Sequence, residues 1–236
     1  QMHEMKQATI LAAGGGSRQR PVTLETPKPL IKVNGTRMMD TSISALKANG
    51  IQDIYLVVGY KKELFHALYD GVPGIHIIEN PYYLQGNNIT SMYMAREYLP
   101  EAFVVEADII IRQPEVFHIH VEKSAYAASW REKTAEWLLT VQNGQIVKYE
   151  KEGSRPAYQL WGLSMWTKAD GERLSEEIRR EFEDNKNLNI YWDEIALDGA
   201  HERYDLGIRK ISESAVCEID TLQELVRIDE QYQKYL

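Results

Sequence analysis

A glycine-rich segment near the start of the chain combines bare backbone with basic side chains. Residues 11–30 have the sequence LAAGGGSRQRPVTLETPKPL, in which three glycines precede Arg18, Arg20 and Lys28. Consecutive glycines after a strand let the backbone turn sharply and point its N–H groups at an anion. Arginine binds phosphate through its planar fork, and lysine binds it as a point charge. This composition is typical of a phosphate-binding loop, although a glycine turn with solvated arginines would share it.

Two common phosphate loops are excluded. The pattern G-x-G-x-x-G requires glycine at position 19, where the chain has glutamine, and G-x-x-x-x-G-K-[ST] is absent.

A longer string carries a family resemblance. It has the form L-A-A-G-x-G-x-R-x-x-P-x-T-x-x-x-P-K-x-L and runs from Leu11 to Leu30. This string resembles that of nucleotidyltransferases of the nucleoside-diphosphate-sugar pyrophosphorylase type. The resemblance implies that the loop wraps the triphosphate of a nucleotide, and that Arg18 and Lys28 act in catalysis by neutralising its phosphates. The loop residues implied to bind nucleotide are Leu11, Ala12, Ala13, Gly14, Gly15, Gly16, Ser17, Arg18 and Lys28.

Acidic residues at strand ends are the candidate metal ligands. Nucleotidyl transfer needs Mg²⁺, which takes carboxylate, phosphate and water oxygens, and ligands of parallel sheets bind at the carboxyl ends of strands. Asp108 closes the apolar segment FVVEAD, and alternation in AVCEIDT points Glu218 and Asp220 to one face. Asp220 is also typical of a helix N-cap. The resemblance implies that Asp108, also a catalytic residue, and Asp220 hold Mg²⁺ with Glu218 as a helper.

Aromatic residues gather in the second half of the chain. Aromatic faces attract cations, and quaternary ammonium groups are frequent guests. Taken singly, each ring is more typical of a hydrophobic core, and Trp161 and Trp166 lie on an apolar strand, so we expect these two in the core.

The motifs E-W-x-L, G-x-S-x-W, Y-W-D and E-I-D-T together resemble one branch of the family, the bacterial CTP:phosphocholine cytidylyltransferases. This resemblance implies CTP and phosphocholine as substrates, and CDP-choline and pyrophosphate as products. Trp137 and Tyr191 would contact the trimethylammonium head, and Asp193 would complement its charge or approach the metal. The acceptor-binding residues implied are Trp137, Tyr191, Trp192 and Asp193.

The segment ENPYYLQGNNITS is where the base- and ribose-contacting loop of the family falls. Asparagine and glutamine can satisfy the mixed donor and acceptor edge of cytosine, although this stretch is also typical of a turn followed by a helix cap. The further nucleotide contacts expected are Asn80, Gln85, Asn87, Asn88, Ser91 and, on the strand before Asp108, Glu106.

The predicted reaction is direct in-line attack by an acceptor phosphate on the α-phosphorus of CTP. Because that phosphate is already an anionic nucleophile, no catalytic serine, cysteine or histidine is needed. Two other functions are compatible with the same motifs: transfer to a sugar-1-phosphate or phosphoethanolamine, and nucleotide binding by a non-catalytic regulatory domain.

The net charge and the cysteine content limit the kinds of partner and compartment that we expect. The 236-residue chain carries a net charge of −8, which disfavours docking on nucleic acid or an anionic membrane. Its single cysteine, Cys217, fits a reducing, cytoplasmic compartment. An aromatic lobe is also able to form a homodimer contact. A choline kinase, fused or separate, is the partner that would supply phosphocholine.

The elements that position these residues alternate between strands and helices. Apolar runs at 8–12, 54–58, 74–79 and 103–106 alternate with helical patterns at 39–48, 61–69 and 88–98. This order predicts an α/β fold with a Rossmann-like, mainly parallel sheet flanked by helices. Further strands at 125–130, 136–142, 145–150 and 160–166, and helical segments at 171–185 and 222–235, predict a smaller antiparallel, aromatic-rich lobe that binds the acceptor.

We therefore expect one nucleotidyltransferase domain over 1–236. Its nucleotide-binding half covers about 5–123, its acceptor-binding lobe about 124–215, and its metal-binding strand and last helix about 216–236.

Overall fold

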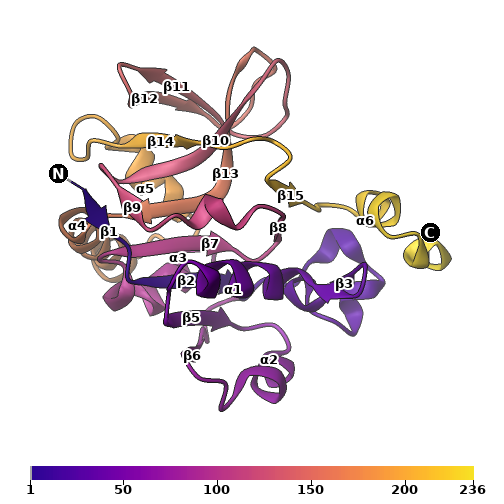
Figure 1. Ribbon diagram of the computed structural model, residues 1–236. Helices are drawn as coiled ribbons and strands as arrows, with labels where there is room; N and C mark the ends of the chain where they lie inside the picture. The colour runs from indigo at the N-terminus through magenta and orange to yellow at the C-terminus, as the bar shows by residue number, and fades with distance from the viewer. Residues whose placement is uncertain (1) are drawn as a thin grey trace.

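A nine-stranded sheet forms the centre of the protein. The computed structural model describes residues 2–236. Seven strands follow the order β12-β11-β13-β7-β2-β5-β6, while β10 pairs with β13 and β14 pairs with β10. Figure 1 shows this order from the β11–β12 hairpin at the top of the view to β6 near the bottom. The sheet strands are β2 (Gln7–Ala12), β5 (Asp53–Val58), β6 (Ile75–Glu79), β7 (Ala102–Glu106), β10 (Ala125–Arg131), β11 (Leu138–Gln142), β12 (Gln145–Glu150), β13 (Ala157–Trp166) and β14 (Gly207–Lys210).

The first half of the sheet is parallel. Strands β7, β2, β5 and β6 run in one direction, and helical segments connect them, as expected for β-α-β units. The helices are α1 (Met38–Ala48), α2 (Lys62–Tyr69), α3 (Ile89–Met94), α4 (Lys168–Arg179), α5 (Trp192–Asp198) and α6 (Leu222–Ile228). The expected α/β class is confirmed.

Alternation along β2 separates two hydrophobic layers. Ile10 belongs to a core that includes Met39 and Leu46 of α1, whereas Leu11 packs with residues of α3, α4 and α5. This is the period-2 pattern of a strand buried on both faces. Helices therefore cover both sides of the parallel strands.

The antiparallel half continues the same sheet. Strand β13 pairs antiparallel with β10 on one side, and with β11 and β7 at successive positions on the other. The β11–β12 hairpin turns at Asn143 and Gly144, both at positive φ, as the Asn-Gly pair predicts. Trp161 and Trp166 are 5% and 0% exposed, so their expected place in the core is confirmed.

Short strand pairs complete the fold: β1 (His3–Glu4) with β9 (His120–Val121), β3 (Lys32–Val33) with β4 (Thr36–Arg37), and β8 (Ile109–Ile111) with β15 (Val216–Glu218). The last of these pairs joins the end of the chain to the residues that follow Asp108. None of the helices within residues 2–236 has both the length and the apolar character needed to cross a membrane.

Several expected boundaries differ from the structure. The helix expected over 88–98 divides into α3 and a 3₁₀ turn at Arg96–Tyr98, and the last helical pattern divides into α6 and a 3₁₀ segment at Glu230–Tyr235. The helix expected at 171–185 starts earlier, because Thr167 caps it by accepting the N–H of Asp170, and it ends as a π-helix at Arg180–Asp184. The strand expected from 136 begins at Leu138.

Candidate active site

The phosphate loop follows β2 and is shaped by one glycine in particular. Gly16 has φ of +62°, and a Cβ at this position would lie 2.9 Å from Thr23 Cγ2 and 3.0 Å from Lys28 Cβ. The hydroxyl of Thr23 donates to the Gly16 carbonyl oxygen at 2.6 Å and closes the loop. At Gly14 and Gly15 a Cβ would meet no atom of residues 2–236 within 4 Å. The first two glycines therefore leave open space in front of the loop, and the third allows its turn.

Three carboxylates from distant parts of the chain meet beside this loop. Strand β15 pairs with β8 so that Glu218 lies opposite Ile109, directly after Asp108. Asp108, Glu218 and Asp220 each offer a carboxylate oxygen, and these atoms lie within 4.8 Å of one another. We call these three residues the acid centre. Its ligand atoms are hard oxygens, the type that Mg²⁺ prefers, so the donor set fits that ion.

The basic residues of the loop contact the acid centre. Lys28 Nζ lies 3.3 Å from Asp108 Oδ2 and 3.9 Å from Asp220 Oδ1. Arg18 reaches Asp220 at 3.5 Å. The Lys28 side chain is only 11% exposed, whereas that of Arg18 is 66% exposed. The structure therefore brings together the glycine loop, its two cations and the three acids that the sequence singles out.

One carboxyl of the acid centre, that of Glu218, has a strongly raised pKa. Burial, followed by repulsion from Asp108 and Asp220, raises the pKa of Glu218 to about 10. A carboxyl with so high a pKa is protonated at neutral pH, and a bound divalent cation would favour its ionised form.

A second layer of acids lies behind the acid centre. Burial, then the charges of Asp108 and Asp193, raise the pKa of Glu106 well above its usual value. Asp193 accepts a hydrogen bond from the Tyr126 hydroxyl at 2.8 Å, and burial raises its pKa to about 7. Glu106 also packs tightly on β13, since a Cβ at Gly162 would lie 2.6 Å from its Cγ. These two carboxyls are therefore partly buried groups whose surroundings favour the protonated form.

Trp137, Tyr191 and Glu194 form what we call the cation corner. The Trp137 and Tyr191 rings meet edge to face, with centroids 5.5 Å apart and planes at 82°, and Tyr149 stacks on Trp137 with centroids 5.9 Å apart. The Glu194 carboxylate accepts the backbone N–H of Tyr191 at 2.9 Å, which fixes it at the start of α5. An aromatic face beside a fixed carboxylate is suited to an organic cation.

One residue links the two sites along the chain. Glu136 directly precedes Trp137, and its pKa is raised by burial, then by the charge of Asp220, with Arg18 acting in the opposite direction. Its carboxyl therefore lies within electrostatic reach of the acid centre, while the next side chain belongs to the cation corner.

The predicted acceptor residues occupy different places. Trp137 is half-buried and Tyr191 is 44% exposed, and both belong to the cation corner. Trp192 is 2% exposed and packs against Tyr126 and Trp166, so its ring belongs to the core and does not line the corner. Asp193 points to Tyr126 and Glu106, behind the acid centre.

Most predicted base-contacting groups hold their own segment together. The Asn80 amide donates to Thr90 and Ser91 at 3.0 and 2.9 Å, and its oxygen accepts the N–H of Tyr82. Asn80 and Ser91 are 2% and 5% exposed. The oxygen of Asn87 accepts the N–H of Asn88.

The remaining two members of this set differ in their surroundings. Asn88 accepts the N–H of Trp192 at 2.9 Å and so ties this segment to α5. Gln85 has an exposed side chain. A contact of any member of the set with the base stays a prediction.

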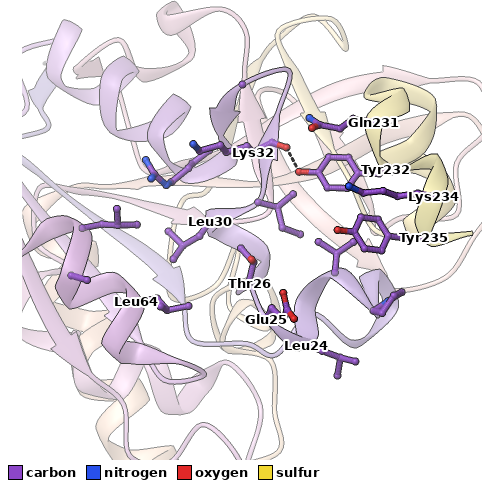
Figure 2. A pocket seen from close by; sticks show the side chains of 17 residues that line it. Leu24, Glu25, Thr26, Leu30, Lys32, Leu64, Gln231, Tyr232, Lys234 and Tyr235 are labelled. Carbon is purple, nitrogen blue, oxygen red and sulfur yellow. Dashed lines mark hydrogen bonds between the residues drawn. The ribbon is translucent and has the colours of Figure 1, made fainter.

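A cavity lies beside the segment that follows the glycines of the phosphate loop. It has a volume of about 870 Å³ and is lined by residues of the 21–37 segment, by leucines of α2 and by the C-terminal 3₁₀ segment. Figure 2 shows Leu24, Leu30 and Leu64 across it from Tyr232 and Tyr235, and the hydroxyl of Tyr232 donates to the Lys32 carbonyl. None of the residues that line this cavity belongs to the acid centre or to the cation corner.

Three residues of the site were not singled out from the sequence: Glu136, Lys151 and Glu194. Glu136 lies within the E-W-x-L motif, so a signal existed for it. Lys151 and Glu194 reach the cation corner only through tertiary packing, and the sequence around them has no feature that would single them out.

Known nucleotidyltransferases are similar to this chain in sequence and in structure. A model of the MobA-like NTP transferase domain matches residues 8–162. The 2-aminoethylphosphonate cytidylyltransferase of Lancefieldella rimae is 35% identical over 97% of this chain and 94% of its own length. The choline-phosphate cytidylyltransferase of Streptococcus pneumoniae is 32% identical over 94% of this chain and 96% of its own. The solved structure of CTP:phosphocholine cytidylyltransferase from S. pneumoniae matches with a TM-score of 0.86 and 29% identity, covering 97% of this chain and 99% of that one.

Proposed function

The chain belongs to the MobA-like NTP transferase family and, within it, to the cytidylyltransferases, and from this premise we propose that it transfers CMP from CTP to phosphocholine. The products would be CDP-choline and pyrophosphate. The wider acceptor class is a small phosphorus oxyanion that carries a cationic amine a few atoms away.

The observation that carries the proposal is the position of the cation corner relative to the acid centre. Glu136 and Trp137 are neighbours in the chain, the first within reach of Asp220 and the second in contact with Tyr191. An acceptor with its phosphate at the acid centre would therefore direct its ammonium group toward aromatic faces. Sugar phosphates require rings of hydrogen-bonding groups instead, and stacked tryptophan and tyrosine side chains suit them less well than they suit a cation.

The reaction we propose needs no covalent enzyme intermediate. An acceptor phosphate oxygen attacks the α-phosphorus of CTP, the new P–O bond forms, and the bond from the α-phosphorus to the pyrophosphate oxygen breaks. Lys28 and Arg18 neutralise negative charge on the phosphates, and the Gly14–Gly16 backbone orients the triphosphate. Mg²⁺ held by Asp108, Asp220 and Glu218 would supply further charge neutralisation at the reacting phosphates.

A second acceptor, 2-aminoethylphosphonate, is favoured by a separate observation. The relative from L. rimae is named for that substrate and matches this chain along its length. A primary ammonium group donates hydrogen bonds, and Glu194 offers a carboxylate acceptor beside the aromatic rings. A trimethylammonium group cannot donate, so it would depend on Trp137 and Tyr191 alone for specific contacts. Phosphoethanolamine shares the primary ammonium and belongs to the same test.

The proposal is tested by measuring pyrophosphate release with Mg²⁺ and each of the four NTPs. The acceptors are phosphocholine, 2-aminoethylphosphonate, phosphoethanolamine and glucose-1-phosphate, and Asp108→Asn serves as the inactive control. We expect CTP to be the preferred nucleotide and phosphocholine to have the highest kcat/KM. Preference for glucose-1-phosphate, or tight CTP binding with no turnover of any acceptor, would contradict the proposal.

A further inference from the structure

The cation corner already contains a cation supplied by the chain itself. Lys151 follows β12 directly, and its Nζ lies over the Trp137 ring, 5.9 Å from the centroid. The same ammonium group forms an ion pair with Glu194. Lys151 thus contacts both elements of the corner, the aromatic face and the carboxylate.

The Glu194 carboxylate is held in place independently of Lys151. Its side chain is 14% exposed, and its second oxygen accepts the Tyr191 N–H at the first turn of α5. A carboxylate that accepts a backbone N–H at a helix start keeps its position when Lys151 leaves. The corner is therefore a preformed cation site.

The Lys151 side chain is more exposed to solvent than the Glu194 side chain with which it pairs. Its side chain is 48% exposed, and a lysine ammonium on a four-carbon stem is strongly hydrated in water. Moving this ammonium into solvent leaves the 14%-exposed Glu194 carboxylate without its ion pair, which is unfavourable unless another cation takes the place of Lys151. An incoming ligand could displace it if that ligand brings its own positive charge.

We propose that Lys151 is an internal competitor for the ammonium group of the acceptor and a specificity determinant of the transfer reaction. This role rests on the proposed function, in which the acceptor cation occupies the corner. Two cations cannot share one aromatic face and one carboxylate, so the acceptor must displace Lys151. A neutral acceptor offers no charge to replace that of Lys151, so the lysine stays paired and the site rejects it.

The proposal predicts a measurable cost to acceptor binding. When only part of a protein is in its binding-competent state, the apparent dissociation constant rises by the inverse of that fraction. A displaceable lysine of this kind weakens cation binding by roughly 5- to 10-fold, the range expected for one partly exposed cation–π contact with an ion pair. Removal of its charge should therefore tighten binding by the same factor.

The test compares the wild type with Lys151→Met, which keeps an unbranched side chain one atom shorter than that of lysine and removes the charge. Lys148→Met is the matched control, because Lys148 lies on β12, the strand that Lys151 follows, is 65% exposed and pairs with Glu150. The probe is tetramethylammonium, titrated to about 100 mM at constant ionic strength and followed by tryptophan fluorescence, with circular dichroism to verify folding. This measurement needs no turnover, so it is independent of the acceptor that the enzyme uses.

We expect Lys151→Met to bind tetramethylammonium roughly 5- to 10-fold more tightly than the wild type and Lys148→Met. In assays with phosphocholine, its acceptor KM should fall by the same factor while kcat and the KM for CTP stay unchanged. Equal or weaker cation binding by Lys151→Met, or no binding by any of the three proteins, would overturn the role of Lys151. Tighter cation binding without turnover of any cationic acceptor would instead leave that role intact and refute the proposed function.

Discussion

Two lysines are each paired with carboxylates, one in the acid centre and one in the cation corner, and they differ chiefly in burial. The Lys28 side chain is 11% exposed and lies among Asp108 and Asp220, whereas the Lys151 side chain is 48% exposed and pairs with Glu194. A buried ammonium that left its partners would strand unpaired carboxylates, which is strongly unfavourable. The Lys151 ammonium is already half in water, but its partner Glu194 is 14% exposed, so Lys151 leaves at little cost only when another cation replaces it.

This difference assigns the two cations different roles. In the proposed function, Lys28 would meet the phosphates of the nucleotide from a fixed, buried position. Lys151 occupies a place that a ligand is expected to take over. The same residue type therefore serves as a structural charge in one region and as a replaceable charge in the other, and burial decides which.

Lys28→Met should have the largest effect of the substitutions that test this comparison. It removes a fixed cation aimed at the triphosphate, and loss of one such preorganised group lowers kcat by roughly 100- to 1,000-fold. The measurement is pyrophosphate release with CTP and phosphocholine. Lys32→Met, at an exposed lysine on the neighbouring β3, is the control and should keep wild-type kcat. A Lys28→Met enzyme within tenfold of the wild-type kcat would remove the distinction between the two lysines.

Trp137→Ala should have an intermediate effect confined to the acceptor. Loss of a partly desolvated cation–π contact of about 2 kcal/mol raises the acceptor KM by roughly 10- to 30-fold and leaves the KM for CTP within about twofold. Steady-state kinetics with each substrate varied in turn measure both constants. Trp130→Ala is the matched control, since Trp130 is 54% exposed and packs on Tyr158 instead. Equal changes in the two KM values would show that Trp137 supports the fold rather than the acceptor.

His66→Asn extends the comparison to a cation outside both sites and should have the smallest effect. His66 contacts Asp70 and Glu79, each at 2.9 Å, and hydrogen bonds to Asp70 and then Glu79 raise its pKa. Because the folded pKa lies above the unfolded value of about 6.5, the stabilisation is complete below that value and disappears as pH rises through the folded pKa.

The wild type should therefore exceed His66→Asn in Tm by at most about 4 °C at pH 6, the shift expected from a surface ion pair. The difference should shrink toward pH 9. Thermal unfolding at the two pH values measures it, and a gap that widens with pH would contradict the assigned sign.

The parallel half of the fold could be predicted from local pattern, and the rest only in part. Apolar runs such as 54–58 and the Asn143-Gly144 turn are local signals, and the structure has the corresponding strands and hairpin. Strand β14 was not expected, because Gly207–Lys210 is short and gains its strand geometry from parallel pairing with β10. Such edge pairing depends on tertiary contacts that the local sequence does not specify.

The candidate site, like the fold, could be predicted only in part from the sequence. The family resemblance expected from the phosphate loop and the aromatic motifs is confirmed by full-length relatives. The structure brings Lys28, Asp108 and Asp220 together, although the roles given to these residues stay predictions. Trp192 is buried in the core despite its place in the Y-W-D motif, because the α5 helix turns that face inward.

The central claim is that the enzyme recognises the positive charge of its acceptor beside the acid centre. The most direct test of this claim compares phosphocholine with 3,3-dimethylbutyl phosphate. This analogue has the shape of phosphocholine, with a neutral carbon in place of the quaternary nitrogen. We predict that kcat/KM with CTP is at least about tenfold higher for phosphocholine, since the difference isolates the cation–π and charge contributions. Equal kcat/KM values for the two acceptors would contradict the account.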